Sequence, residues 1–334
     1  MPPRLSHNLP RLKVAANNIV NAETQQAFVL RGVNVSGLEY SCPDCVACPA
    51  DAFVDEAALL EIVCNWKANI IRVPFNQEWA LERPGYDPRP YRNALERTIY
   101  IAAAAGAYTL LDLHWLDDRT PRGTINGRPN FVPPLPDLDS IRVWRQLAEL
   151  WREETAVLYD LFNEPHDVLP DDSIPVSRIR DDGSTYVLRS RKVRHREWRP
   201  WARHLIQAIR SRNPDALIFV SGTDWGFDLR NCVMPDIPGL VYSTHVYPWK
   251  PDNWDCAFGD LAGAVPVFAG EWGGGDCDVG WGLRLAAFFE DRGIGWTAWS
   301  WSDEPRLITC AQRGSFEPTR FGAFVRGLLQ SKRC

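Results

Sequence analysis

Eight short apolar, β-rich runs alternate along the chain with helical stretches, and this alternation constrains the fold more than any other feature. The runs expected to form strands are residues 28–35, 69–74, 108–114, 157–163, 217–221, 240–245, 266–271 and 295–301. Candidate helices, several of which end at or near a glycine, are residues 55–66, 92–106, 141–153, 198–212 and 282–293. Repeated alternation of strand and helix predicts an α/β fold in which a parallel sheet closes into a (β/α)8 TIM barrel.

The barrel is expected to span residues 28–303 of a single domain, residues 1–334. Barrels with insertions reach this length, and no linker, repeat or low-complexity tract divides the sequence. Residues 11–27 precede the first strand and contain Asn17-Asn18, a pair suited to a tight turn. We therefore predict a small N-terminal β-hairpin at the bottom of the barrel.

Residues 165–196 form the longest interruption of the pattern and are expected to be a long loop after strand four. Asp182-Gly183 reads as a turn between two short extended arms. Because this segment follows a strand at the carboxyl end of the barrel, we expect it to form part of one wall of a site.

The charge distribution argues against nucleic-acid and membrane partners. The net charge is −5, whereas nucleic-acid binding needs a basic surface. No apolar run approaches the ~20 residues of a membrane span. A local basic run comprises Arg189, Arg191, Lys192, Arg194, Arg196 and Arg199, and it follows an acidic stretch of Asp171, Asp172, Asp181 and Asp182. We interpret the basic run as a self-paired or solvated loop.

The nine cysteines fall into an early group (Cys42, Cys45, Cys48, Cys64), a late group (Cys232, Cys256, Cys277, Cys310) and Cys334. The early spacing could hold zinc, but no histidine lies near, so disulfides that staple surface loops are favoured. Disulfides predict a secreted or periplasmic protein. Residues 1–12 contain no apolar core of a signal peptide, so export would require a leader that has been removed.

Polar and aromatic side chains stand at the predicted carboxyl ends of six strands, where barrel proteins gather their functional groups. In chain order they are Arg72, His114, Asn163, Glu164, His245, Tyr247, Glu271 and Trp299. Each glutamate ends an apolar run, a position where an ionised carboxylate is costly unless it has a partner or a function. Two converging carboxyl groups would suit acid-assisted cleavage of a glycosidic bond.

Seven segments in this order resemble glycoside hydrolase family 5, the cellulase-like retaining glycosidases. They are residues 30–34 (LRGVN), 72–74 (RVP), 112–114 (DLH), 162–165 (FNEP), 245–247 (HVY), 270–271 (GE) and Trp299, and together they cover about residues 28–303. The resemblance implies one catalytic domain that acts on a polysaccharide or oligosaccharide.

The resemblance also implies roles for the two glutamates, with Glu164 as the acid/base and Glu271 as the nucleophile. A retaining enzyme needs these carboxyl groups about 5 to 5.5 Å apart. Glu164 must be protonated when substrate binds and Glu271 ionised, so we expect their environments to differ. Pro165 disfavours helical geometry at Glu164 and keeps that residue extended.

Further roles follow from the same resemblance. Arg72 and Tyr247 would hold the nucleophile ionised, and Asn163 would contact the sugar 2-hydroxyl. His114 and His245 would hydrogen-bond the sugar or the carboxylates. Trp299 would be an aromatic platform under the sugar. Taken singly, Arg72 could also pair with a core carboxylate, His114 could be a satisfied buried histidine, and Trp299 could be a core residue.

Eight further tryptophans lie in or beside the predicted loops that follow the strands. They are Trp79, Trp115, Trp225, Trp249, Trp254, Trp272, Trp281 and Trp301. Indole rings there could stack on successive sugars, which favours an extended polysaccharide over a small glycoside. Tryptophan also packs in barrel shells, so we expect about half of the eight to touch substrate.

The function predicted is that of a retaining endo-β-1,4-glucanase, a cellulase that is monomeric and needs no cofactor or metal. The sequence contains no glycine-rich phosphate loop and no calcium-loop spacing. Alternatives with the same mechanism are a β-mannanase, an exo-acting β-glucosidase and a β-1,3-glucanase. A barrel that binds carbohydrate without catalysis is the alternative from another class. Sugar specificity and endo or exo action stay open at this stage.

Overall fold

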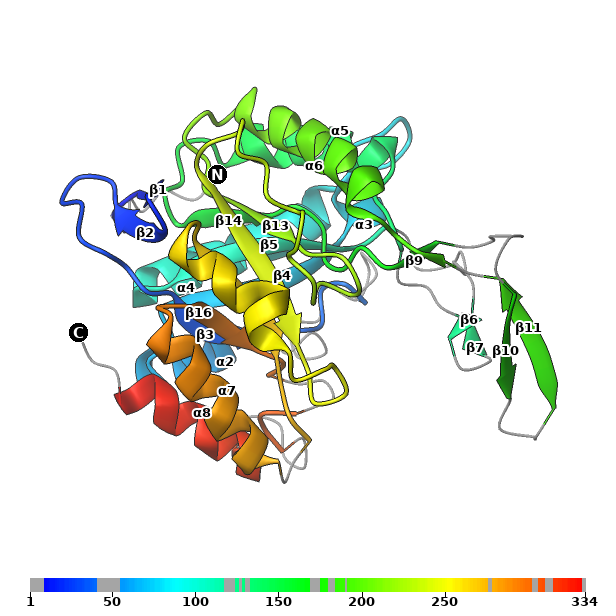
Figure 1. Ribbon diagram of the computed structural model, residues 1–334. Helices are drawn as coiled ribbons and strands as arrows, with labels where there is room; N and C mark the ends of the chain where they lie inside the picture. Colours follow the sequence, from blue (N-terminus) through cyan, green and yellow to red (C-terminus); the bar gives the residue numbers. More distant parts are fainter. Residues whose placement is uncertain are drawn as a thin grey trace.

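A closed barrel of eight parallel strands forms the centre of the molecule (Figure 1). The computed structural model describes residues 9–40, 55–116, 124–125, 128–129, 133–168, 175–179, 184–189, 191–275, 278–301, 306–309 and 315–331. The barrel strands are β3 (Arg31–Asn34), β4 (Ile70–Asn76), β5 (Tyr108–Trp115), β8 (Val157–Asp160), β13 (Ile218–Ser221), β14 (Leu240–Val246), β15 (Val267–Trp272) and β16 (Gly295–Ala298). Each pairs with its neighbours in chain order, and β16 pairs with β3 to close the barrel, which confirms the predicted (β/α)8 fold.

Helices cover the outside of the barrel (Figure 1). They are α2 (Glu56–Leu60), which continues into η1 (Glu61–Asn65), α3 (Gln77–Ala80), α4 (Arg89–Ala105), α5 (Leu138–Leu150), α6 (His195–Arg210), η2 (Asp255–Gly259), η3 (Asp260–Gly263), α7 (Val279–Asp291) and α8 (Arg320–Ser331). Helices α4, α5, α6 and α7 begin at residues 89, 138, 195 and 279, rather than at the predicted 92, 141, 198 and 282. The prediction followed the apolar residues and missed the first turn of each of these helices. In α5 that turn begins at a polar cap, where Asp137 accepts from Ser140 N.

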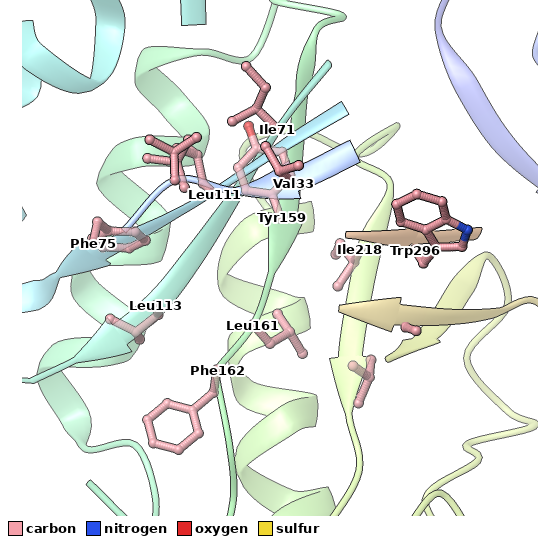
Figure 2. Close-up of a cluster of buried hydrophobic side chains, with 14 of the residues drawn as sticks. Val33, Ile71, Phe75, Leu111, Leu113, Tyr159, Leu161, Phe162, Ile218 and Trp296 are labelled. Carbon is pink, nitrogen blue, oxygen red and sulfur yellow. The ribbon is translucent and has the colours of Figure 1, made fainter. Parts of the chain in front are cut away.

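Outward-facing strand residues pack against the helices as the main hydrophobic core. Figure 2 shows part of this cluster, in which Ile71, Leu111 and Tyr159 lie together. Buried indoles tie helices to strands, because Trp144 Nε1 on α5 donates to Leu161 O at 2.9 Å and Trp198 Nε1 on α6 donates to Ser221 O at 2.8 Å. The helical shell therefore holds the strand ends at fixed positions.

The N-terminal hairpin closes the amino-terminal end of the barrel. Its strands β1 (Leu12–Ala15) and β2 (Asn18–Asn21) are antiparallel, and Leu12 and Ile19 join a buried apolar cluster with residues near the strand starts, including Ile70 and Phe268. The predicted hairpin is confirmed, but its two-residue turn is Ala16-Asn17 rather than Asn17-Asn18. Ala16 adopts the left-handed conformation there, with φ of 50°.

The long segment after β8 forms two antiparallel pairs. A stem joins β9 (Asp167–Val168) to β12 (Arg191–Lys192), and a hairpin pairs β10 (Pro175–Ile179) with β11 (Thr185–Arg189). The hairpin projects away from the barrel (Figure 1). A further short antiparallel pair joins β6 (Thr124–Ile125) to β7 (Arg128–Pro129). The two predicted arms are present, whereas the predicted turn at Asp182-Gly183 and the acidic stretch 171–172 and 181–182 lie outside the described residues.

The predicted disulfides are not found among the described cysteines. Cys64, Cys232 and Cys256 are free thiols, and Cys232 is buried. The other six cysteines lie outside the described residues: Cys42, Cys45, Cys48, Cys277, Cys310 and Cys334. The first three of these belong to the early group considered for zinc. Within the described ranges, none of the helices has both the length and the apolar character needed to cross a membrane.

Candidate active site

Arg72 is the centre of a buried polar network at the carboxyl end of the barrel. The side chain is fully buried, and each guanidinium nitrogen donates a hydrogen bond. The acceptors are Asp160 Oδ2 at 2.9 Å, Asn34 Oδ1 at 2.9 Å, Glu271 Oε1 at 2.7 Å and Asn163 Oδ1 at 2.9 Å. Asp112 Oδ2 lies 3.1 Å from Nη2. Burial opposes the charge of Arg72, but Asp112, Asp160 and Glu271 together raise its pKa, so the cation persists.

Glu271 receives two donors that favour its ionised form. Arg72 Nη1 reaches Oε1 at 2.7 Å, and Tyr247 Oη donates to Oε2 at 2.7 Å. Only 3% of the residue is exposed. Burial raises the pKa of the Tyr247 phenol well above its usual value, so Tyr247 keeps the proton that it donates. Strand β15 thus presents a carboxylate that is oriented and charge-compensated from two sides.

Glu164 lies four residues beyond the end of β8 at Asp160, not at the strand end predicted from residues 157–163. The segment between them still follows the barrel wall. Asn163 N donates to Leu113 O at 3.0 Å, and Ser221 Oγ donates to Asn163 O at 2.8 Å. These bonds fix the backbone that carries Glu164, although it is no longer strand.

The environment of Glu164 favours its protonated form. Burial is the main cause that raises the pKa of this carboxyl to about 7, against lowering contributions from His114, Lys250 and Arg72. Its side chain is 14% exposed, so it can reach the cleft. Among the described residues, no arginine or lysine contacts Glu164 as Arg72 contacts Glu271. The two carboxyl groups therefore sit in unlike surroundings, and Glu164 is the one poised to hold a proton near neutral pH.

Glu164 and Glu271 converge on the same space. One oxygen of each, together with a ring nitrogen of His245, lies within 4.8 Å of the others. This separation fits the roughly 5 to 5.5 Å of retaining glycosidases and is shorter than the ~6.5 to 9.5 Å of inverting ones. The same three groups could offer ligands to a metal ion, but the guanidinium of Arg72 beside Glu271 disfavours a second cation there.

His245 is clamped between two glycines and bridges the carboxyl groups. Its Nδ1 lies 2.8 Å from Glu164 Oε1 and 3.6 Å from Glu271 Oε2. A Cβ on Gly226 would come within 2.8 Å of the ring. A Cβ on Gly270 would come within 2.5 Å of Ser243 Oγ and 3.0 Å of His245 Nε2, which explains why a glycine precedes Glu271. Burial lowers the pKa of His245 to about 4, so the ring is neutral. Within the described structure Nε2 has no hydrogen-bond partner, which favours the proton on Nδ1 and donation to Glu164.

His114 and Trp299 form the opposite side of the site. Their rings stack with centroids 5.6 Å apart. His114 Nδ1 lies 2.6 Å from Asp112 Oδ2, and its Nε2 lies 3.3 Å from Asn163 Nδ2. Burial lowers the pKa of His114, but the charge of Asp112 outweighs it and raises the pKa to about 9. The ring is therefore protonated near neutral pH, and both of its nitrogens then carry hydrogen.

The structure divides the eight loop tryptophans into two groups. Five are buried or packed against the core: Trp79, Trp254, Trp272, Trp281 and Trp301. Three stand beside site residues. Trp115 follows His114 and packs edge-on against Tyr40, Trp225 stacks on His166 with centroids 3.7 Å apart, and Trp249 stacks on Tyr247 at 4.5 Å. Trp249 is 71% exposed, so one of its faces is open.

The network contains polar residues that the sequence interpretation missed. Asn34 accepts from Arg72 and donates to Gly270 O at 3.0 Å, and Asp112 and Asp160 supply the negative charge around Arg72. The signal was available for Asp160, since it is a lone carboxylate in the apolar run VLYDLF. All eight predicted site residues lie around the same space, and none lies elsewhere in the fold.

A (β/α)8 barrel that presents two carboxyl groups at this spacing has the architecture of a glycoside hydrolase. Comparison with protein-family models identifies the family within this class. The model of the cellulase family, glycosyl hydrolase family 5, matches residues 21–305, so the chain belongs to this family.

Sequence relatives and solved structures agree with this membership. Endoglucanase E-5 of Thermobifida fusca is 25% identical over 329 residues, covering 90% of this chain and 60% of the relative. Endoglucanase N of Pectobacterium atrosepticum is 24% identical over 301 residues, covering 86% of this chain and 56% of the relative. The chain therefore spans less than two thirds of the length of these relatives.

Two solved structures show the same fold. The β-glucanase SdGluc5_26A of Saccharophagus degradans superposes with a TM-score of 0.71 at 20% identity, covering 97% of this chain and 94% of that one. The catalytic domain of Thermobifida fusca endoglucanase Cel5A superposes with a TM-score of 0.69 at 23% identity, covering 96% of this chain and 97% of that one.

Proposed function

We propose that the chain is the single catalytic domain of a retaining endo-β-1,4-glucanase that cleaves β-glucan chains by double displacement. The observation that carries this proposal is the convergence of Glu164 and Glu271 within 4.8 Å, in surroundings that favour a protonated Glu164 and an ionised Glu271. A nucleophile and a proton donor at this distance can act on opposite sides of one glycosidic bond.

In the first step an oxygen of Glu271 attacks the anomeric carbon, and the bond between that carbon and the glycosidic oxygen breaks. Glu164 gives its proton to the departing oxygen, so the leaving chain departs as an alcohol and a glycosyl ester of Glu271 remains. Arg72 and Tyr247 orient the attacking carboxylate by their 2.7 Å contacts. The developing positive charge on the sugar is balanced by the carboxylate itself.

In the second step a water molecule attacks the same carbon and the ester bond to Glu271 breaks. Glu164, now ionised, takes a proton from that water, so both carboxyl groups return to their starting states. Donation from His245 Nδ1 to Glu164 Oε1 supports the ionised stage of this cycle. Two inversions leave the product with the configuration of the substrate.

The remaining residues would bind the sugar at the cleavage point. The amide of Asn163 would contact the 2-hydroxyl, an interaction that strengthens in the transition state. His114 would hydrogen-bond a sugar hydroxyl, and the Trp299 ring stacked beside it would lie under the pyranose. The open face of Trp249 would hold a further sugar unit, which favours a chain over a short glycoside.

The substrate class rests on the relatives. Two sequence relatives are named endoglucanases, and a structural neighbour is a β-glucanase that was solved with cellotetraose. A β-mannanase, an exo-acting β-glucosidase and a β-1,3-glucanase share the mechanism and are the competing assignments. A barrel that binds carbohydrate without cleaving it would have no need for two carboxyl groups in unlike environments.

We also propose that the enzyme is monomeric, takes a saccharide as its partner and acts outside the cytoplasm. A polymeric glucan does not cross a membrane, so its hydrolysis requires a secreted or periplasmic enzyme. The described cysteines are free thiols and give no support to export.

A reducing-end assay on carboxymethyl cellulose, glucomannan and laminarin tests the assignment. We expect the fastest release from carboxymethyl cellulose, with a rapid fall in viscosity that marks endo cleavage. Glu164→Ala should lose about 10²- to 10⁴-fold on substrates with poor leaving groups, and azide should restore turnover of activated ones. Faster cleavage of glucomannan or laminarin would reassign the sugar. Saccharide binding by calorimetry without any product would favour the binding barrel instead.

A further inference from the structure

A surface cavity lies beside the start of α6 and the loop after β13, and neither Glu164 nor Glu271 lines it. Its volume is about 370 Å³, and its lining is rich in cationic and amide side chains: Arg194, His195, Arg196, Arg230 and Asn231, with Asp228 as the acidic member. Pockets of this size are large enough to take a monosaccharide unit or a substituent of one.

The arginines of this cavity are not equivalent. Arg230 is neutralised by Asp228, since its Nη2 lies 2.6 Å from Oδ2 and its Nε donates to Oδ1 at 2.9 Å. Arg194 and Arg196 are exposed, and neither side chain has a carboxylate partner among the described residues. The protein as a whole carries a net charge of −5. The side chains of Arg194 and Arg196, which have no carboxylate partner among the described residues, therefore make this cavity locally positive on an otherwise acidic protein.

The basic run was expected to be self-paired or solvated. Lys192 is paired, with its Nζ 2.8 Å from Asp224 Oδ1. Arg194 and Arg196, two and four residues later, are exposed and line the cavity.

Both walls of the cavity are tied to the segment that follows Glu164. Val193 N, next to Arg194, donates to His166 O at 3.2 Å. Trp225 N, in the loop after β13, donates to Pro165 O at 3.2 Å. These bonds connect neighbours of the cavity-lining residues to residues 165 and 166, which follow Glu164 in the chain, and in the proposed function Glu164 faces the departing chain.

We propose that this cavity binds an anionic group carried by the saccharide on the leaving-group side, a sugar carboxylate or a sulfate ester. The planar forks of Arg194 and Arg196 match the oxygens of either group, and His195 and Asn231 add donors. The position relative to the cleft rests on the proposed function, whereas the anion site itself does not. The chain would thereby prefer acidic β-glucans over neutral ones.

The first test measures binding by the intact protein. Calorimetric titrations with sodium glucuronate, sodium sulfate and glucose are run on the parent, on Arg194→Ala/Arg196→Ala, and on Arg145→Ala/Arg320→Ala. The last pair removes two exposed arginines of α5 and α8, for which no ion pair is found among the described residues, so net charge is matched. We expect millimolar binding of one or both anions but not of glucose, weakened about tenfold or more only in the first variant. The anion that binds more tightly shows whether the cavity takes a carboxylate or a sulfate. Equal anion affinity in the two double variants would overturn the proposal.

The second test compares substrates. For the same three proteins, kcat/KM is measured on carboxymethyl cellulose, cellulose sulfate and neutral cellohexaose. Arg194→Ala/Arg196→Ala should lower kcat/KM on the acidic substrates, relative to cellohexaose, about fivefold. The decrease should be smaller in about 0.5 M salt, and kcat/KM on cellohexaose should be unchanged. Equal losses in the control pair would show long-range attraction instead and contradict the proposal. Failure to cleave any substrate would refute the proposed function, while the binding titrations would still decide the anion site.

Discussion

The two ends of the barrel interior are built on the same strands and differ in chemistry over a distance of two residues. Inward-facing positions of a strand recur every second residue, so successive pairs mark successive layers. On three neighbouring strands the apolar layer of Ile70, Leu110 and Leu158 is followed by the charged layer of Arg72, Asp112 and Asp160. The apolar layer belongs to the cluster that the N-terminal hairpin closes, and the charged layer supports the two glutamates.

The difference separates stability from function. Burial of the apolar layer stabilises the folded state, and this contribution depends on close packing rather than on the orientation of particular groups. The charged layer pays a desolvation cost that the contacts around Arg72 offset, and its value lies in the orientation of Glu271. Substitutions in the two layers should therefore be distinguishable. Those in the charged layer should reduce turnover, and those in the apolar layer should reduce stability.

The largest effect is expected for Glu271→Gln. The amide keeps the size and the hydrogen bonding of the side chain but cannot form the glycosyl ester, so kcat should fall by about 10⁴-fold or more. The melting temperature should be unchanged or slightly lowered, because Arg72 loses one charged partner but keeps Asp112 and Asp160. Initial rates and a thermal melt on the same preparation check both statements. Near-parental turnover would exclude Glu271 as the nucleophile.

In the apolar layer, Ile70→Ala should reduce stability and leave turnover nearly unchanged. Loss of this fully buried side chain should lower the free energy of unfolding by about 2 to 5 kcal/mol, with kcat within about twofold of the parent at a temperature where the variant is folded. Denaturant unfolding measures the first quantity. Ile70→Val is the graded control, with an expected cost of about 0.5 to 1.5 kcal/mol. A stable variant with much reduced kcat would show that the layers are not separable.

The pH dependence sharpens the account of Glu164. With a pKa of about 7, its acid form is lost as pH rises, so kcat/KM should fall with an alkaline limb near pH 7. On a substrate with an activated leaving group, which needs no proton, Glu164→Gln should lose this limb.

Stability gives an independent check of the same pKa. A carboxyl raised from 4.5 to about 7 holds a proton in the folded state that the unfolded chain releases. The free energy of unfolding of the parent should therefore decline, relative to Glu164→Gln, as pH rises from about 4.5 to about 7. A flat difference across this range would mean that the pKa of Glu164 is not raised.

The smallest effect is expected at the rim, where Trp249 is exposed and contacts Tyr247 through a flat stack. Trp249→Ala should raise KM on long glucans about three- to tenfold, in keeping with the strength of one aromatic contact. Trp249→Phe should recover most of the loss. Because Tyr247 also loses a packing partner, a fall in kcat larger than the rise in KM would show that Trp249 acts through Tyr247 rather than on the sugar.

Much of the fold could be predicted from the sequence because each element carried a local signal. The apolar runs gave all eight strands, but the end of the fourth was placed at residue 163 rather than at Asp160, since Leu161 and Phe162 continue the apolar pattern after strand pairing ends. The hairpin turn was placed one residue late because Asn17-Asn18 has the better turn propensity, whereas strand register selects Ala16-Asn17.

The candidate site was predicted less completely. Residues at strand ends could be found from position, but the partners of Arg72 come from different strands, and no local pattern tells which carboxylates meet. Trp272 and Trp225 both follow polar residues in loops or strand ends, yet one is fully buried among helices and the other borders the site. The cavity beside Arg194 also depends on tertiary contacts, since it joins the start of α6 to the loop after β13.

The stereochemistry of the first product distinguishes a retaining mechanism from an inverting one. Time-resolved proton NMR of cello-oligosaccharide hydrolysis shows which anomer appears before mutarotation. Two carboxyl groups with oxygens within 4.8 Å leave no room for an inverting water, so we predict that the β-anomer forms first and the α-anomer grows only as mutarotation proceeds. Initial formation of the α-anomer would contradict the roles given to Glu164 and Glu271.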